Sequence, residues 1–238
     1  MLHHLKSFIP LRVKHWLRWN SPHAIDEFIR KYLGDQCILV QIGSNDGRQG
    51  DPLYKWIKRK KNWRGLLVEP VPYLFDRLKQ NYRKKQGLLF FNAAISDESE
   101  HITLWSVDPK AVNSLDLPYW FDQLASFDRN HITSHLGSKI EPYIIQISVP
   151  AVSLTEAIKL NMIEKIDLLH IDTEGYDYNI LRQLDFSRFR PTIIMYEHKH
   201  LQKSNYISAQ FLLRSEGYIL EEHGGYTIAL YEGAPRLG

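Results

Sequence analysis

Short apolar runs alternate with stretches of helical periodicity along most of this sequence. The helical stretches repeat apolar residues every three or four positions, as Ile25, Phe28, Ile29 and Tyr32 do, which is typical of one buried helical face. Strands are predicted at residues 38–42, 66–69, 88–95, 166–171 and 192–196, and helices at about 21–34, 52–61, 154–160, 178–184 and 205–217, with a further helix after Pro72 that aligns Leu74, Leu78 and Tyr82. This alternation predicts βαβ units and a mostly parallel sheet.

The C-terminal region changes to a different pattern. Residues 218–222 and 226–231 are two short runs rich in apolar residues, separated by His223, Gly224 and Gly225. A Gly-Gly pair between two such runs is a hairpin signal. We therefore expect an α/β fold whose parallel sheet has helices on both faces and ends in an antiparallel hairpin.

Residues 106–148 interrupt the strand-and-helix alternation. They carry aromatic residues such as Trp120 and Phe127, together with Arg129, His131 and His135, and show little periodicity. Long irregular insertions in compact domains tend to be lids or binding loops. The sequence therefore predicts one domain over residues 21–238 with an insertion at about 106–148 that contacts the substrate.

Bulk composition narrows the class of protein. The 238 residues, with 44% hydrophobic and 24% charged content and a net charge of +3, suit one sizeable soluble α/β domain. The single cysteine, Cys37, excludes a disulfide within the chain and favours a reducing, cytoplasmic location. Basic residues gather at 55–64 and 77–85 on predicted helices, where solvated charge is the ordinary explanation, so nucleic acid is not an expected partner.

The first 20 residues have a character of their own. Lys6, Arg12, Lys14 and Arg18 alternate with apolar and aromatic residues, and the segment lacks the continuous apolar centre of a signal peptide. A basic amphipathic segment can lie on an anionic membrane surface. Residues 1–19 are therefore a candidate for peripheral membrane contact, and packing on the protein's own domain or on a partner is the alternative.

A glycine-rich turn follows the first predicted strand. Gly43, Asn45, Asp46 and Gly47 lie directly after the apolar run 38–42, and Glu69 closes the next run 22 residues after Gly47. Glycine permits a positive φ and close approach of a ligand. An acidic residue about 20 positions beyond such a turn suits pairing with ribose hydroxyls. The two features predict a nucleotide-like cofactor at the carboxyl edge of a parallel sheet.

Acidic residues end two later strands. Asp172 and Glu174 follow the run 166–171, and Glu197 and His198 follow the run 192–196. If these strands are neighbours, Asp172, Glu197 and His198 converge beside the cofactor.

Three chemical roles fit that cluster. The side chains can hold a divalent cation, act as a general base with an orienting partner, or cap the following helices. His200 faces the same way as His198 if the strand continues past Glu197, whereas His170 lies inside an apolar run and is expected in the core or near the site.

Four segments in this order resemble the FkbM-type family of S-adenosylmethionine-dependent methyltransferases. They are VQIGSNDG (residues 40–47), LVEPVP (67–72), NAAISD (92–97) and IDLLHIDTEGYD (166–177). The resemblance implies a seven-stranded Rossmann-like sheet and methyl transfer, usually to a hydroxyl of a sugar, a glycan or another small natural product.

The resemblance also implies roles for individual residues. Gly43, Asn45 and Gly47 would approach the amino acid end of the cofactor, and Glu69 would hold the ribose hydroxyls. The turn containing Asn92, Ala94 and Ser96 would border the adenine, and Asp172 would lie near the methyl donor. Gln41 stands where the family often carries an acid, so Asp46 is a substitute contact for the cofactor's ammonium, and His170 stands where lysine is common.

The trio Asp172, Glu197 and His198 also resembles the metal cluster of cation-dependent O-methyltransferases. There a cation such as Mg²⁺ would lower the pKa of the acceptor hydroxyl and orient it. Without a metal, His198 or Asp172 would take the proton. These three residues are the candidate catalytic and metal-ligating residues.

Two rival functions use the same features. An NAD-dependent oxidoreductase would also employ Glu69, although the spacing from Gly43 to Gly47 does not fit Gly-x-Gly-x-x-Gly. A non-catalytic module would keep the cofactor pocket and dock a partner through its aromatic insertion.

Overall fold

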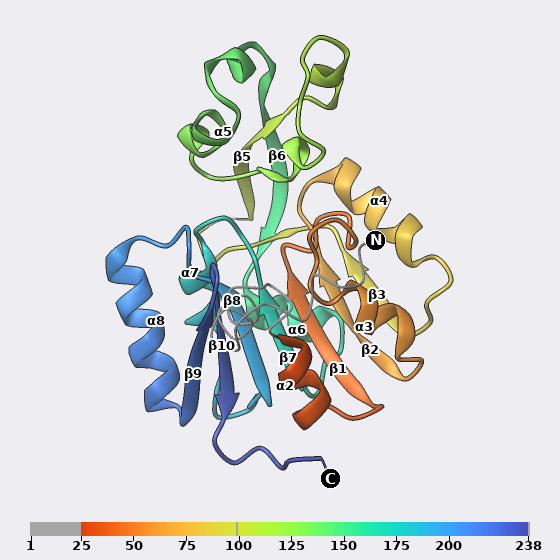
Figure 1. Ribbon diagram of the computed structural model, residues 1–238, viewed down its shortest axis with the longest axis vertical. Helices are drawn as coiled ribbons and strands as arrows, with labels where there is room; N and C mark the ends of the chain where they lie inside the picture. Colours follow the sequence, from red (N-terminus) through yellow and green to blue (C-terminus); the bar gives the residue numbers. More distant parts are fainter. Residues whose placement is uncertain (1–24, 99, 238) are drawn as a thin grey trace, which may run out of the picture.

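A seven-stranded sheet forms the centre of the computed structural model, which describes residues 25–98 and 100–237 (Figure 1). The strand order is β3-β2-β1-β7-β8-β10-β9; β3, β2, β1, β7 and β8 run parallel, and β10 is antiparallel to both of its neighbours. The strands are β1 Cys37–Ile42, β2 Trp63–Val68, β3 Leu88–Phe91, β7 Leu168–Ile171, β8 Ile193–Glu197, β9 Tyr218–His223 and β10 Tyr226–Tyr231. The predicted α/β fold, with its mostly parallel sheet and final hairpin, is confirmed.

Helices cover both faces of this sheet. They are α2 Ile25–Tyr32, α3 Tyr54–Arg59, α4 Pro72–Tyr82, α6 Leu154–Leu160, α7 Asp177–Leu181 and α8 Lys203–Ser215. Residues of α2, α3 and α4 pack with Leu39 on one face, and residues of α6, α7 and α8 pack with Val40 and Ile42 on the other. Burial on both faces explains why the strands read as nearly continuous apolar runs. Within the described ranges no helix is long and apolar enough to cross a bilayer.

The order of the strands fixes where a ligand site can form. β1 lies between β2 and β7, so the connections from the two halves of the sheet leave in opposite directions at this point. Ile42 pairs with both Val68 and Ile171, which brings the carboxyl ends of β2, β1 and β7 to one level. Ligands in open α/β sheets bind at such a reversal, outside the carboxyl ends of the strands.

The insertion is built on a second, three-stranded sheet. β5 (His101–Val107) pairs antiparallel with β6 (Ile144–Val152), and β6 pairs parallel with β4 (Ala94–Ile95). In Figure 1 this sheet rises away from the central sheet and carries α5 (Arg129–Leu136) at its far end. Three short 3-10 helices, Pro109–Asn113, Phe121–Gln123 and Ser138–Tyr143, and a small apolar core complete it. The prediction that residues 106–148 are irregular is therefore wrong at both ends of this segment, where the chain belongs to the antiparallel pair of β5 and β6.

The predicted strand 88–95 is likewise divided. β3 ends at Phe91 in the central sheet, and β4 begins at Ala94 in the second sheet. Between them the Asn92 side-chain amide donates to the carbonyl oxygens of Glu69 (2.8 Å) and Pro70 (3.0 Å). This local bonding turns the chain out of the central sheet, because it ties residue 92 to the end of β2.

The N-terminal extension at residues 1–20, its proposed membrane contact, and the predicted helix start at Ser21 lie outside the described residues. Cys37 is buried, and burial raises the pKa of its thiol well above the ordinary value. An inert core thiol is the result, as the sequence predicts.

Candidate active site

Gly43 begins the turn at the end of β1. Its φ is +76°, and its N–H and that of Ser44 both donate to the carbonyl oxygen of Val68, at 3.1 and 3.0 Å. A Cβ at this position would lie 1.7 Å from the carbonyl oxygen of Asp172. The protein's own backbone therefore requires glycine here, apart from any ligand.

The second half of the turn packs away from the cavity. Gly47 has a φ of +66°, and a Cβ there would collide with Leu78 and Tyr82 of α4. Oδ1 of Asp46 accepts hydrogen bonds from the N–H groups of Arg48 and Gln49, both at 2.8 Å. Neither Asp46 nor Gly47 lines the cavities described below. Both residues shape the turn, and Asp46 is not placed as the expected contact for an ammonium group.

Glu69 holds the glycine turn from the end of β2. Its Oε2 accepts from the N–H of Asn45 at 2.8 Å, and its Oε1 accepts from the N–H of Val71 at 2.9 Å. Asn45 adopts a φ of +46°, which is uncommon for a residue other than glycine. Burial raises the pKa of Glu69 to about 7, although the two N–H groups oppose that shift. Each oxygen keeps a free acceptor site, since a carboxylate has about four.

A largely apolar cavity opens beside Glu69. It comprises about 580 Å³ of empty space, part of which is open to solvent, and lies between the carboxyl ends of the central strands and the insertion. Its wall includes Gly43, Asn45, Glu69, Ala94, Ile95, Leu104, Gln123, Phe127, Asp172, Tyr176 and Ile180. We call it the apolar cavity.

Two predicted residues support this cavity from outside. Asn92 does not line it but ties the chain before Ala94 to the end of β2. Ser96 is buried, and its hydroxyl lies 3.4 Å from that of Tyr176, whose ring packs on Phe127 with centroids 4.7 Å apart. The insertion thus supplies one aromatic wall of the cavity, and the loop after β7 supplies the other.

A second, polar cavity adjoins the first on the α3 side of the sheet. The two share Gly43, Asn45, Gln123, Asp172 and Glu174. The second is also lined by Gln41, Asp51, His170, Glu197, Lys199 and Tyr226. We call it the acidic cavity, because four carboxyl groups and one ammonium group border it.

Asp172 stands where the two cavities meet. Tyr226 donates a hydrogen bond from its hydroxyl to Oδ2 of Asp172 at 2.7 Å. Burial, with the negative charges of Glu174 and Asp177 nearby, raises the pKa of Asp172 to about 8. The Tyr226 bond holds one carboxyl oxygen in place, which fixes the direction of the other.

Glu197 faces Asp172 across the acidic cavity. Burial, with Asp172 and Glu174 nearby, raises the pKa of Glu197 to about 9, and Lys199 donates to its Oε1 at 3.3 Å. The N–H of Glu197 donates to Oδ1 of the buried Asp177 at 3.1 Å. The two strand-end acids converge as the sequence predicts.

His198 does not join them. β8 ends at Glu197, and the N–H groups of His198 and Lys199 both donate to the carbonyl oxygen of Gly225. The His198 ring then lies against Tyr206, with Nδ1 2.9 Å from the hydroxyl of Thr227. No potential metal-binding group among the described residues combines Asp172, Glu197 and His198. The predicted trio is therefore wrong in its third member, because the chain turns at the residue where a continued strand was expected.

His170 and Gln41 form the floor of the acidic cavity. They pair across β7 and β1 and so lie side by side on one face of the sheet. Burial lowers the pKa of His170 to about 4, and neither ring nitrogen has a hydrogen-bond partner among the described residues. The Oε1 of Gln41 is also buried without one. Buried polar groups of this kind usually form hydrogen bonds with water or with a polar ligand.

A family model decides the class of protein. The model of the methyltransferase FkbM domain matches residues 41–220, a span that contains Gly43, Glu69, Asp172 and Glu197. The chain belongs to the methyltransferase FkbM family. It is therefore a methyltransferase of the S-adenosylmethionine-dependent type, and the NAD-dependent alternative is set aside.

Solved structures similar to this methyltransferase are distant in sequence. A precorrin-6y C5,15-methyltransferase from Geobacter metallireducens is 11% identical, with a TM-score of 0.44 over 83% of this chain and 81% of that one. A Methanococcus jannaschii fibrillarin pre-rRNA processing protein is 9% identical, with a TM-score of 0.48 over 92% and 77%. The METTL16 methyltransferase domain is 12% identical, with a TM-score of 0.46 over 94% and 69%. No curated protein sequence matches the chain.

The methyltransferase site also contains residues that the sequence does not predict. Tyr226 and Lys199 reach the acidic cavity from the hairpin and from the turn after β8, and Asp51 reaches it from the loop before α3. Burial raises the pKa of Asp51 to about 6. None of these residues carries a local signal, because each is placed by pairing between distant strands or by a loop.

Proposed function

We propose that this methyltransferase transfers a methyl group to a hydroxyl of a sugar, a glycan or another small polyhydroxyl compound. The observation that supports it most is the junction of an apolar cavity and an acidic cavity at Asp172. A donor held in the first has its reactive end directed at an acceptor held in the second.

The residues of the apolar cavity fit S-adenosylmethionine. Glu69 keeps a free acceptor site on each oxygen, which suits the two ribose hydroxyls. Ala94, Ile95, Phe127 and Tyr176 offer apolar and aromatic surface to the adenine. The carboxyl groups of Asp172 and Glu197 have raised pKa values, and the positive sulfur of a bound donor would favour their ionised forms. When bound, S-adenosylmethionine supplies an activated methyl group and leaves as S-adenosylhomocysteine.

The acidic cavity suits a neutral acceptor rich in hydroxyl groups. Its polar lining offers both acceptors and donors, including Gln41, Gln49, His170 and Tyr226. A phosphate or a nucleic acid is disfavoured, because its negative charge would face Glu174, whose pKa is lowered, and three further carboxyl groups, with Lys199 as the one ammonium group of the lining. The buried groups of His170 and Gln41 that have no partner gain hydrogen bonds from a bound polyol.

The chain's own residues then perform three tasks. Tyr226 holds Oδ2 of Asp172, which leaves Oδ1 to accept the proton of the acceptor hydroxyl as the new carbon–oxygen bond forms and the carbon–sulfur bond breaks. Glu197 and Lys199 orient the acceptor from the opposite side. The insertion keeps water from the reacting groups through Gln123 and Phe127. Alignment supplies much of the rate, because the methyl group is already activated.

The test combines the purified protein, S-adenosylmethionine labelled with tritium in the methyl group, and a cell extract separated into small-molecule, protein and nucleic acid fractions. Label should enter neutral small molecules or glycans, and it should resist mild alkali because methyl ethers do not hydrolyse. Label in protein or nucleic acid, release of labelled methanol by alkali, or no transfer to any fraction would each contradict the proposal.

A further inference from the structure

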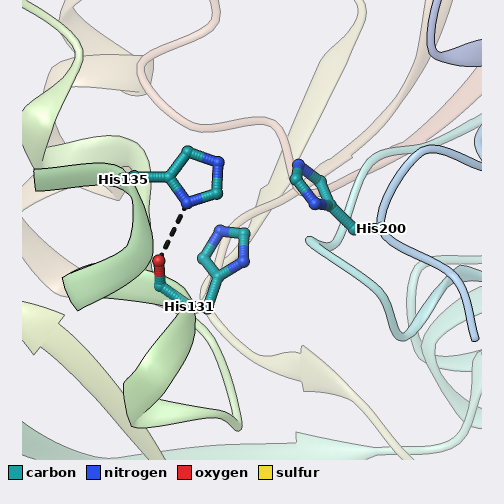
Figure 2. Close-up of side chains that lie close together, drawn as sticks. All are labelled: His131, His135 and His200. Carbon is teal, nitrogen blue, oxygen red and sulfur yellow. Dashed lines mark hydrogen bonds between the residues drawn. The ribbon is translucent and has the colours of Figure 1, made fainter.

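Four side chains from three separate segments meet above the acidic cavity. His131 and His135 lie four positions apart on α5, which places them on one helical face. His200 comes from the turn after β8, and Glu174 from the loop after β7. Figure 2 shows the three imidazole rings gathered together, with His200 facing the pair on α5. The ring centroids are 4.4 to 5.4 Å apart.

The ligand atoms have the spacing of a metal site. Nε2 of His131 and Nε2 of His200 lie 3.1 and 3.3 Å from the same atom, Oε2 of Glu174. Tetrahedral Zn²⁺ with ligands at about 2.0–2.1 Å separates its ligand atoms by roughly 3.3–3.4 Å. The three histidines offer nitrogens that all lie within 4.8 Å of one another, so His135 completes the set by a small side-chain movement.

Burial makes this arrangement costly without a cation. The exposed fractions of the side chains of His131, His200 and Glu174 are only 9%, 15% and 19%. The three atoms that face one another are withdrawn from solvent. They lie at ion-pair distance, but none of them has a hydrogen bond of normal geometry among the described residues. Buried polar atoms without such bonds call for a ligand, and lone pairs that converge call for a cation.

The tautomer of His135 also supports a metal site. Its Nδ1 lies 2.8 Å from the carbonyl oxygen of His131, so Nδ1 carries the proton and donates it. The other nitrogen, Nε2, is then a free lone pair, and Figure 2 shows it on the side of the ring that faces His200. A metal-bound histidine usually donates its other N–H to an oxygen in this way.

We propose that His131, His135, His200 and Glu174 bind one transition-metal ion, of which Zn²⁺ is the best match. Three imidazoles and one carboxylate suit Zn²⁺, whereas Mg²⁺ and Ca²⁺ prefer oxygen ligands. This site differs from the predicted trio, since it contains neither Asp172 nor His198.

The ion would link the insertion to the central sheet. Two of its ligands belong to α5, and the other two follow β7 and β8. The insertion also provides Gln123 and Phe127 to the cavities, and Glu174 lines both of them. Metal binding would therefore hold the insertion in place beside both cavities.

The experiment uses untagged full-length protein, because a polyhistidine tag would itself bind metal. The protein is stripped with a chelator and titrated with Zn²⁺ and with Co²⁺, and bound metal is counted by mass spectrometry. We expect one ion per chain, a visible Co²⁺ spectrum of the tetrahedral type, and a higher melting temperature with zinc. A chain that takes up neither ion overturns the proposal.

Matched variants distinguish zinc binding at this site from nonspecific zinc binding by other histidines. His131→Gln and His200→Gln should each weaken zinc binding by roughly tenfold or more, whereas His198→Gln, two residues from His200 and outside the cluster, should bind as the wild type does. Equal melting temperatures of the metal-free variants and metal-free wild type show that folding is intact. Unchanged binding in both cluster variants, or equal loss in His198→Gln, contradicts the assignment. None of these readouts requires methyl transfer, so the site is tested independently of the proposed reaction.

Discussion

The Oε2 atom of Glu69 accepts a hydrogen bond from the backbone N–H of Asn45 at 2.8 Å. The acid that ends β2 thus holds the turn that ends β1, and both belong to the wall of the apolar cavity. Glu69 therefore has two tasks, since its remaining acceptor sites face the place proposed for the ribose. This pairing links the stability of the turn to the affinity for the cofactor.

Affinity for S-adenosylhomocysteine should rise with pH through the titration of Glu69. Burial raises the pKa of Glu69 to about 7, and the ionised form is the better acceptor for ribose hydroxyls. Below pH 7 binding must first release a proton, so affinity should increase about tenfold between pH 6 and pH 8. Calorimetric titration at several pH values measures this affinity. In Glu69→Gln the affinity should be lower and this part of the pH dependence absent; a Gln variant with the same pH dependence as wild type contradicts the role.

Gly43→Ala should destabilise the fold far more than Gly50→Ala. Both glycines have similar positive φ values, +76° and +72°, so both substitutions carry the same backbone strain of about 1–2 kcal/mol. Only at Gly43 would the added Cβ lie against a backbone oxygen, 1.7 Å away, whereas at Gly50 the space is open. We expect a loss of more than about 4 kcal/mol for Gly43→Ala, measured by urea unfolding. Equal losses would show that contact with Asp172 is unimportant.

Asp172→Asn should abolish most methyl transfer while the cofactor still binds. Removing a general base costs roughly a hundredfold or more in rate, and the amide can still accept the bond from Tyr226. The rate is measured with labelled S-adenosylmethionine, and binding by calorimetry. Asp76→Asn on α4, whose side chain is 74% exposed, is the matched control and should act as wild type. An active Asp172→Asn variant would show that another group accepts the proton of the acceptor hydroxyl.

Phe127→Ala should weaken binding of S-adenosylhomocysteine. The Phe127 ring packs on Tyr176 at 4.7 Å and lines the apolar cavity. Loss of an aromatic contact of about 0.5–1.5 kcal/mol corresponds to a roughly twofold to tenfold lower affinity. Tyr119→Ala is the control, since Tyr119 belongs to the same insertion, is 72% exposed and lines neither cavity. Equal affinities of the two variants would show that the insertion does not contact the cofactor through Phe127.

The sequence alone predicts the central sheet well, for a physical reason. Strands buried on both faces must be continuously apolar, so residues 38–42 and 166–171 are visible as runs, and their polar ends mark the edge of the sheet. Gly43, Glu69 and Asp172 were located in this way, and the structure places all three around one cavity.

The roles of the histidines could not be read from the sequence. Whether His198 or His200 faces the acids depends on where β8 ends, and that is fixed by the N–H groups that donate to Gly225, more than 20 residues later in the chain. The spacing of His131 and His135 is a local signal for a pair of metal ligands on a helix, but only the folded insertion brings His200 to them.

A crystal structure of the complex with S-adenosylhomocysteine would show whether the cofactor occupies the apolar cavity with its sulfur beside Asp172. We expect the ribose hydroxyls to bind Glu69, the adenine to lie between residues 93–95 and Phe127, and the sulfur to lie beside Asp172, open to the acidic cavity. A ligand bound outside the apolar cavity, or one whose sulfur faces away from Asp172 and Glu197, would contradict this expectation.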